Sequence, residues 1–343
     1  MNITSKPEMV LAQFGCGYWG PNLLRNFSSL RDCVVKYVVD ASEERRRFVR
    51  QTFPQSTATE TVEEALADPE VDAVIIATPA GTHFELGCRA LQAGKHIFVE
   101  KPLATTVAEV DELDRYAKKR GLVIMAGHTF IYNSAVRYVK DLIDRGELGD
   151  VRYIYSQRLN LGRIRSDIDA LWNFAPHDVS IIQYWLGNPT PVGVSRHGMA
   201  YMQHEIDDVV FLNLEYPGKI IANIHVSWLD PHKVRRMTVV GSRKMVVYDD
   251  VAENKIALHD KGIDRKAILG ENMDFDRSPS LPFNYRSGDI LFPQIHFAEP
   301  LRAEAEHFRD CVLNRQTPIT GVEHARSVVA ILEKAGSSQR NGV

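Results

Sequence analysis

A glycine-rich turn between an apolar run and a helix-like segment is the feature that most constrains the fold. Gly15, Gly17 and Gly20 form a GxGxxG pattern directly after the apolar run from Met9 to Phe14. The first glycine permits a tight turn, the second lets the backbone approach a pyrophosphate, and the third lets helix and strand pack closely. The N-terminus of the helix expected from Trp19 to Leu30 would present free N–H groups to the anion. The pattern therefore predicts a dinucleotide-binding turn.

A second apolar segment indicates which dinucleotide is favoured. It ends at Asp40, twenty positions after Gly20, where a carboxylate can accept hydrogen bonds from the adenosine ribose hydroxyls. Its charge would repel a 2′-phosphate, so NAD is favoured over NADP. Ser42 and the run Arg45-Arg46-Arg47 follow at once and offer an alternative cradle for that phosphate. The solvated face of a helix explains the same arginines.

Size and composition bound the class of protein. The 343 residues suffice for two domains, and the apolar fraction of 44% and charged fraction of 25% are those of a globular protein. A net charge of -3 gives no reason to expect nucleic acid as a partner. No signal peptide or membrane-spanning run is recognisable, and the four cysteines have no metal-binding spacing. We therefore expect a cytoplasmic protein without a metal or membrane partner.

Residues 1–127 show the alternation of a parallel sheet with helical crossovers. We expect six strands, the number of a full dinucleotide-binding sheet, and a capping box formed by Thr61 and Glu64. The strands that can be located are Met9–Phe14, Cys33–Val39, Ala73–Ala77, His96–Val99 and Leu122–Ala126. The helices are expected at 19–30, 42–51, 82–93 and 107–120.

Residues 128–343 have a different pattern, with long and mostly consecutive strands that favour a large, mostly antiparallel open-faced sheet in an α+β domain. The predicted strands are 151–161, 191–202, 208–216, 219–228 and 234–240, and the predicted helices are 175–186, 299–314 and 323–335. The polar stretch from Glu253 to Phe292 is expected to form a long surface loop. Apolar residues occur on both faces of the predicted sheet, so we expect a second copy of the chain to cover one face, in a homodimer or homotetramer.

Two groups of polar residues follow strands four and five of the first domain. Thr78, Pro79 and His83 follow one strand, and Glu100-Lys101-Pro102 follow the other. The carboxyl ends of parallel strands are where open α/β sheets bind ligands. Lys101 would then lie over the crevice where a nicotinamide binds, and the proline would stiffen the turn, with a cis peptide as one option.

The motifs GCGYWG (with Tyr18 and Trp19), VVD, ATPAGTH and GKHIFVEKPLA together resemble the glucose–fructose oxidoreductase, inositol dehydrogenase and MocA family. The resemblance covers nearly the whole chain, and EKP is its most specific element. It implies that Glu100 contacts the nicotinamide ribose, that Lys101 binds the reacting hydroxyl, and that His83 lies beside the cofactor.

The segment Trp172-Asn173-Phe-Ala-Pro-His177-Asp178 is the second constellation. If a helix begins near Phe174, Pro176 falls in its first turn, where proline is tolerated. Asn173 and His177 would then lie near one another, with Trp172 beside the cofactor. The family commonly has Asp and His at this interval, with His as proton acceptor. Asn173 departs from this, because an amide cannot accept a proton, but it can bind a substrate hydroxyl.

The expected chemistry requires few groups. Oxidation of a secondary alcohol transfers a hydride to C4 of the nicotinamide and removes the hydroxyl proton. His177, as a histidine with an unperturbed pKa near 6.5, is suited to accept that proton. Lys101 either loses its charge through desolvation or stays charged and stabilises the developing alkoxide.

The segments GYWGPNLLRNF, RLNLG, WNFAPHD and YRSGD…EPL resemble the branch of nucleotide-sugar 3-dehydrogenases, such as those that oxidise UDP-N-acetylglucosamine for polysaccharide or lipid A precursors. Arg163 and Arg165 would bind the diphosphate through bidentate hydrogen bonds, although a surface-charge role explains them as well. Further candidates for substrate contact are Arg286, Asn160, His128 and Tyr132. A free cyclitol, sugar or sugar phosphate remains an alternative substrate, and a non-catalytic dinucleotide-binding regulator is a further alternative.

Overall fold

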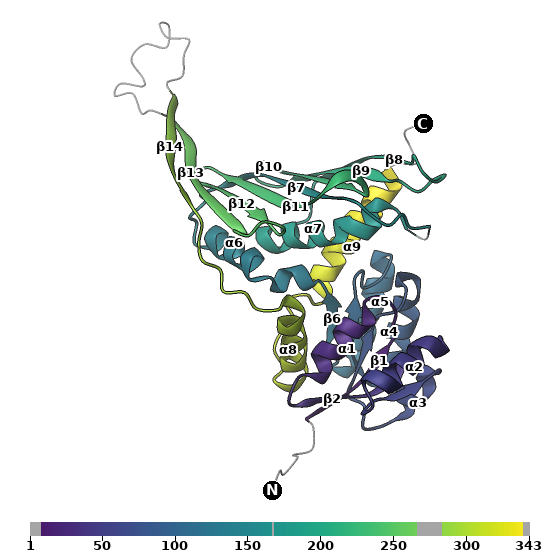
Figure 1. The fold of residues 1–343 in the computed structure, drawn as a ribbon. Coiled ribbons are helices and arrows are strands. Elements are labelled where there is room, and N and C mark those ends of the chain that lie inside the picture. Colours follow the sequence, from purple (N-terminus) through teal and green to yellow (C-terminus); the bar gives the residue numbers. More distant parts are fainter. Residues whose placement is uncertain (1–7, 167, 266–282, 339–343) are drawn as a thin grey trace, which may run out of the picture. The chain divides into compact units, whose positions relative to one another are not determined.

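The computed structural model describes residues 8–166, 168–265 and 283–338, which form two compact units (Figure 1). The first unit runs to Asn133 and also takes in Val179–Tyr184 and Phe297–Ser337. The second contains Ser134–Asp178 and Trp185–His296. Each unit is therefore assembled from segments that are distant in the sequence.

The first unit is built on a parallel six-stranded sheet, sheet A, with the strand order β3-β2-β1-β4-β5-β6. This is the order of a dinucleotide-binding fold. The third strand, Thr57–Thr59, is so short that the sequence did not locate it. The strands are β1 Met9–Phe14, β2 Cys33–Val39, β3 Thr57–Thr59, β4 Ala73–Ile76, β5 His96–Glu100 and β6 Ile124–Gly127.

Sheet A is buried on both faces because successive side chains of its strands enter two separate cores. In β1, Val10 and Ala12 pack on one side, whereas Met9 and Leu11 pack on the other. The first face is covered by α3 Val62–Ala67, α4 His83–Gln92, α5 Val107–Arg120 and α9 Val322–Ser338. The second is covered by α1 Gly20–Ser28, α2 Glu43–Thr52 and α8 Pro300–Leu313.

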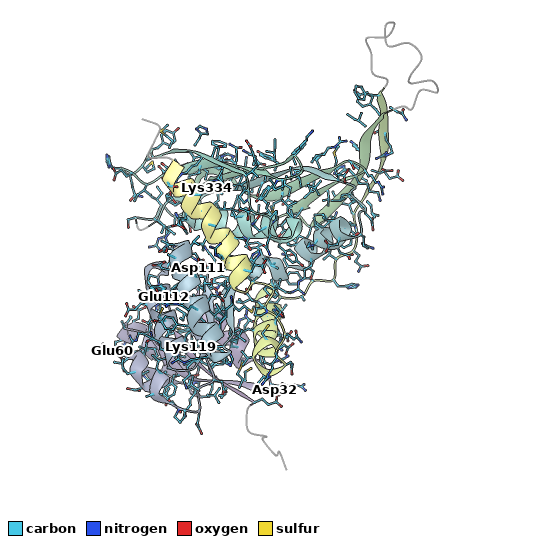
Figure 2. The ribbon with its side chains drawn as sticks, turned by 180° about the vertical axis from the view of Figure 1, so that it is seen from behind. Asp32, Glu60, Asp111, Glu112, Lys119 and Lys334 are labelled. Atoms are coloured by element: carbon cyan, nitrogen blue, oxygen red, sulfur yellow. The ribbon has the colours of Figure 1, made fainter. Side chains whose placement is uncertain are left out.

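Helices α8 and α9 return from the end of the chain to the first unit. Arg326 of α9 forms an ion pair with Asp111 of α5; Asp111 is labelled in Figure 2. Helix α8 packs beside α1, and the rings of Phe27, Phe98 and Phe308 meet edge to face with centroids 5.6 to 6.1 Å apart. Such aromatic contacts each contribute roughly 0.5–1.5 kcal/mol beyond the burial of their area.

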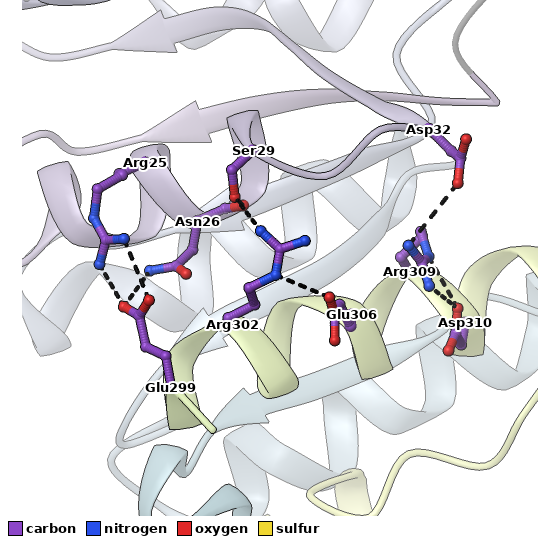
Figure 3. Close-up of polar contacts among 9 residues, drawn as sticks. All are labelled: Arg25, Asn26, Ser29, Asp32, Glu299, Arg302, Glu306, Arg309 and Asp310. Carbon is purple, nitrogen blue, oxygen red and sulfur yellow. Dashed lines mark hydrogen bonds and ion pairs between the residues drawn. The ribbon is translucent and has the colours of Figure 1, made fainter. Parts of the chain in front are cut away.

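Polar contacts fix α8 along its length (Figure 3). Glu299 at its start accepts hydrogen bonds from Arg25 and Asn26 of α1. Arg302 donates to the Ser29 hydroxyl at 2.9 Å. The apolar contacts and this polar seam together hold α8 in one register on sheet A.

The second unit is built on an eight-stranded sheet, sheet B, with the order β14-β13-β12-β11-β7-β10-β9-β8. Its neighbours are antiparallel except for β10 and β7, which run parallel. The predicted large, mostly antiparallel sheet is confirmed. Its strands are β7 Val151–Leu161, β8 Gly193–Met199, β9 Val209–Tyr216, β10 Ile220–Ser227, β11 Leu229–Gly241, β12 Met245–Asp249, β13 Ile256–Arg265 and β14 Phe283–Leu291.

The two faces of sheet B differ in burial. Leu212 and Ile224 are fully buried on the face along which α6 Ser134–Asp144 and α7 Ala170–Leu186 run (Figure 1). On the other face, Phe211 stacks on His225 with ring centroids 4.2 Å apart and is 42% exposed. Tyr153, Tyr155 and Ile221 are exposed as well. Within a single chain, sheet B therefore has one face covered by helices and one open face.

Three local predictions are wrong. The side chain of Thr61 makes no capping hydrogen bond, and the capping box lies instead at Thr106 and Glu109, before α5. The predicted loop 253–292 contains β13 and β14 in its described part, while 266–282 lie outside the described residues. Helix α7 begins at Ala170 rather than near Phe174, so Pro176 lies inside it.

Within the described residues, no helix is long and apolar enough to cross a membrane.

Candidate functional site

The glycine turn has the geometry that a dinucleotide requires. Gly15 has φ of 90°, and a Cβ there would lie 2.5 Å from the carbonyl oxygen of Ala77. A Cβ on Gly20 would lie 2.6 Å from the carbonyl oxygen of Gly15. A Cβ on Gly17 would meet no atom within 4 Å among the described residues, so the backbone is open to a ligand there. Tyr18, which follows it, is 93% exposed.

Gln13 holds this turn closed, a role that sequence reasoning missed. Its amide Nε2 donates to the carbonyl oxygens of Gly15, at 2.9 Å, and Gly20, at 3.0 Å. The side chain is fully buried in β1. A polar residue inside an otherwise apolar strand was the signal that could have revealed it, because buried amides need partners.

Asp40 lies at the end of β2, and both of its carboxylate oxygens contact backbone amides. Oδ2 accepts from the N–H of Cys16 at 2.7 Å and Oδ1 from that of Ser42 at 2.9 Å. Each carboxylate oxygen has two lone pairs, so a ribose hydroxyl can still be bound. Arg46, which was a candidate for contact with a 2′-phosphate, donates to the carbonyl oxygens of Asp40 and Ala41 and forms an ion pair with Glu43.

The turns after β4 and β5 are tied together by His83. Its Nδ1 lies 2.8 Å from the carbonyl oxygen of Pro102, and its Nε2 lies 2.9 Å from that of Thr78. The ring is buried, and burial lowers the pKa of His83 despite the two carbonyl contacts. The peptide between Lys101 and Pro102 is cis. His83 therefore connects the Thr78-Pro79 turn to the Glu100-Lys101-Pro102 turn, which we call the EKP turn.

Glu100 is the most perturbed carboxyl group at these strand ends. Its Oε2 accepts from the N–H of Lys101 at 3.2 Å, and the Trp19 side chain also donates to this carboxyl. Burial raises the pKa of Glu100 to about 7, although the charge of Lys101 and the two hydrogen bonds act in the opposite direction. A carboxyl group that titrates near neutral pH is typical of functional sites.

His128 and Tyr132 are both buried in the first unit just beyond β6. His128 packs edge to face against His324, with ring centroids 5.3 Å apart, and burial lowers its pKa well below the usual value. The Tyr132 hydroxyl lies 3.4 Å from that of Thr320. Their predicted contact with substrate stays a prediction.

Helix α7 carries the second constellation. Asp169 caps it, because its side chain accepts from the N–H of Trp172 at 2.9 Å. Asn173 and His177 are one turn apart and therefore share a face of the helix. The ring nitrogen Nδ1 of His177 is buried. Asn173 lies in the first turn of α7 and His177 in the second, because the helix begins at Ala170.

The residue after His177 fixes α7 on sheet B. Arg158 of β7 donates through Nε to Asp178 Oδ2 at 2.6 Å, and the Ser156 hydroxyl donates to Oδ1 at 2.7 Å. All three side chains are buried. This pair limits the rotation of α7, and with it the direction in which His177 faces.

The predicted diphosphate arginines do not gather in one place. Arg163 and Arg165 follow β7 and are exposed. Arg286 is on edge strand β14, where its Nε contacts Asp260 Oδ1 at 3.0 Å. Four strand spacings of ~4.8 Å separate β7 from β14, or roughly 19 Å, so Arg286 does not join the other two within one chain. Asn160 precedes them in β7, and its Oδ1 is buried.

Two protein-family models match the chain. One is described as "Oxidoreductase family, NAD-binding Rossmann fold" and matches residues 11–128. The other is described as "GFO/IDH/MocA C-terminal domain" and matches residues 136–247.

Curated relatives include two enzymes of Bacillus subtilis. The chain is 27% identical to scyllo-inositol 2-dehydrogenase (NAD(+)) over 82% of this chain and 79% of that enzyme. It is 28% identical to scyllo-inositol 2-dehydrogenase (NADP(+)) IolW over 56% of each. The chain spans 56% to 59% of the length of the first curated relatives that it matches.

Among solved structures, UDP-N-acetylglucosamine 3-dehydrogenase GnnA from Acidithiobacillus ferrooxidans superimposes with a TM-score of 0.80. The identity is 24%, and the match covers 96% of this chain and 97% of the other. At this identity the likeness shows that the two chains share a fold.

Proposed function

The chain belongs to the Gfo/Idh/MocA oxidoreductase family, and from that premise we propose that it is an NAD-dependent dehydrogenase of a sugar secondary hydroxyl. The observation that carries this proposal is the Glu100-Lys101-Pro102 turn at the end of β5, where burial raises the pKa of Glu100 and His83 connects the turn to the one after β4. A turn of this chemistry at the carboxyl end of a parallel strand is suited to a nicotinamide and a hydroxyl.

The cofactor that we propose is NAD. The open backbone at Gly17 and the carboxylate of Asp40 support a pyrophosphate and an unmodified ribose. Arg46 is held by its own contacts rather than offered to a 2′-phosphate. When bound, the nicotinamide supplies the hydride acceptor. Because one Bacillus subtilis relative is named for NADP, both cofactors should be assayed.

The protein groups that we propose for the chemistry are Lys101, His177 and Asn173. Lys101 binds the reacting hydroxyl and stabilises negative charge on its oxygen. His177 accepts the hydroxyl proton. Asn173, one turn away on α7, binds a neighbouring hydroxyl, since its amide cannot act as a base. Asp178 and Arg158 keep the helix face that bears His177 in place.

The substrate that we propose is a nucleotide sugar of the UDP-N-acetylhexosamine type, oxidised at C3. The shared fold with GnnA over nearly the whole chain supports this choice. The exposed Arg163 and Arg165 remain the candidates for the diphosphate. The inositol dehydrogenases among the relatives favour the second candidate, a free cyclitol or sugar.

A panel of compounds tests the proposal. UDP-N-acetylglucosamine, its uronate, UDP-glucose and scyllo-inositol would be incubated with NAD or NADP, and reduced cofactor and keto product measured. Lys101→Ala should abolish turnover while NAD still binds. Lys119→Ala removes an exposed lysine of α5 (Figure 2) and should leave turnover unchanged. Turnover that survives in Lys101→Ala would refute the assigned role, and binding without turnover of any sugar would favour the non-catalytic regulator.

We also propose that the chain forms a homodimer or homotetramer through the open face of sheet B. Phe211, Tyr153 and Ile221 are 42%, 48% and 53% exposed there, which is a large apolar area for a monomer. The molar mass in solution would test it, and Phe211→Glu should dissociate the assembly. The four free cysteines favour a reducing compartment such as the cytoplasm.

A further inference from the structure

Helix α8 brings a carboxyl group into the interior of the first unit. Glu304 is 0% exposed and lies between the core residues Leu301 and Phe308. Its Oε2 accepts a hydrogen bond from the Thr129 hydroxyl at 2.6 Å. Its Oε1 is buried and has no hydrogen-bond partner among the described residues. A buried carboxyl oxygen in this condition calls for a physical explanation.

Glu100 has a matching oxygen. Its Oε1 is also buried and makes no hydrogen bond within the described part of the chain. Glu100 is paired with Gly127 in the register of β5 and β6, and a Cβ on Gly127 would lie 3.2 Å from this same Oε1. Thr129, which holds Glu304, follows two residues later. The two carboxyl groups are close enough that the charge of Glu100 raises the pKa of Glu304.

Two neighbouring carboxyl groups in a buried site cannot both be ionised without a large cost, so one proton is retained between them. The local contacts decide where it resides. Glu100 has the N–H of Lys101, the Lys101 charge and the Trp19 side chain to stabilise an anion. In the described part of the chain, Glu304 accepts only from the Thr129 hydroxyl, and burial raises its pKa well above the usual range. The proton therefore belongs to Glu304.

We propose that Glu304 is a positioning residue that remains a neutral acid and donates its proton as a hydrogen bond to Glu100 Oε1, directly or through one bound water. This hydrogen bond favours the ionised form of Glu100 and fixes its carboxyl group beside Lys101. This deepens the proposed function, on which it rests, because an anionic Glu100 is the better acceptor for a ribose hydroxyl. The polar seam of α8 against α1 keeps Glu304 at this depth (Figure 3).

The surrounding titratable groups are compatible with this assignment. They come from the EKP turn, the end of β6, helix η2 (Thr129–Tyr132), α8 and α9, and they are Lys101, His128, Tyr132, His307 and His324. Burial lowers the pKa of His128 well below the usual value and that of His324 to about 4. Neither imidazole is therefore charged at neutral pH, and Lys101 is the cation that stabilises the Glu100 anion.

The affinity for NAD, measured by calorimetry as a function of pH, tests this assignment without a sugar substrate. Glu304→Met removes the proton donor, so the pH at which affinity is gained should rise by about one unit, equivalent to about tenfold weaker binding at a fixed pH below the transition. Glu304→Gln retains an N–H donor and should show the same pH dependence of NAD affinity as the parent chain. Glu306→Gln, on the exposed side of the same helix, is the matched control and should change nothing.

The results separate the possible outcomes. An unchanged pH dependence in Glu304→Met, or an equal shift in Glu304→Gln, would overturn the assignment. If Glu304→Met does not fold, infrared spectroscopy of the folded parent chain should show a protonated carboxyl band above neutral pH that Glu304→Gln removes, and its absence would also overturn the assignment. The predicted NAD profile without oxidation of any sugar would refute the proposed dehydrogenase and leave Glu304 as the proton holder.

Discussion

The buried pair of Arg158 and Asp178 should be strongly coupled in stability. The side chains are 7% and 1% exposed, so neither charge has water as a substitute partner. Arg158→Met would remove the guanidinium that contacts Asp178, and Asp178→Leu would remove the carboxylate that contacts Arg158, so each variant takes this partner away from a buried charge. Breaking a buried ion pair in this way costs about 3–5 kcal/mol. Each single variant should therefore lose that amount of unfolding free energy.

The double variant Arg158→Met/Asp178→Leu should be much closer to the parent, because apolar groups of similar volume replace a buried ion pair at little or no cost. Equilibrium urea unfolding provides the free energies. The exposed pair Arg326 and Asp111, with side chains 49% and 51% accessible, is the control and should show a coupling below about 1 kcal/mol. If the double variant loses the sum of the two single losses, the reasoning is refuted.

Three further predictions concern the first unit. Gly20→Ala should weaken NAD binding at least about tenfold in calorimetry, because its Cβ would lie 2.6 Å from the backbone oxygen of Gly15, and unchanged affinity would show that the turn adapts. Gln13→Leu should cost about 1–3 kcal/mol of unfolding free energy, because two turn carbonyls lose their donor, and a loss below the error of the measurement would contradict that role. Because burial raises the pKa of Glu100 to about 7, its stability contribution is present below its ordinary pKa near 4.5 and is lost as the pH rises through 7. The parent chain should therefore lose about 3 kcal/mol of unfolding free energy relative to Glu100→Gln between about pH 4 and 8. This comparison cancels the opposite contribution of His324, whose pKa burial lowers to about 4, whereas Glu304 acts in the same direction as Glu100, because the charge of Glu100 raises its pKa. Parallel stability curves for the two chains would contradict it.

Sequence reasoning located the strands of sheet A apart from the short, partly exposed β3, because the longer strands are buried on both faces. Such strands are continuous apolar runs, and Cys33–Val39 was predicted with the bounds that the structure has. Helix α5 was equally clear, because Gly121 ends it in the left-handed conformation, with φ of 66°. A buried strand and a glycine that ends a helix can therefore both be recognised from the local sequence.

The elements that were predicted wrongly lack such local sequence signals. Strands β13 and β14 are at the edge of sheet B, and the described residues of β14 are mostly exposed, so their polar sequence looked like a loop. The start of α7 was misplaced because Pro176 was taken as a first-turn residue, whereas Asp169 caps the helix. Thr61 and Glu64 match the sequence pattern of a capping box, but the Thr61 side chain makes no capping hydrogen bond, because the local backbone geometry decides whether that bond forms.

The site was predictable where a motif carries it and unpredictable where distant segments meet. The glycine turn and the EKP turn are short motifs, and the structure shows both at the carboxyl ends of their strands. Glu304 comes from a helix near the end of the chain, and its contact with Thr129 depends on how α8 packs on sheet A. Arg286 illustrates the opposite error, because its motif did not indicate that it lies at the far edge of sheet B.

The central claim is that a hydride passes from C3 of a nucleotide sugar to NAD. UDP-N-acetylglucosamine carrying deuterium at C3 would be incubated with the protein and NAD, and the products examined by mass spectrometry and NMR. We predict deuterium at C4 of the nicotinamide in NADH together with a 3-keto nucleotide sugar. Deuterium that stays in the sugar, or reduction of NAD by inositol but by none of the nucleotide sugars, would contradict the claim.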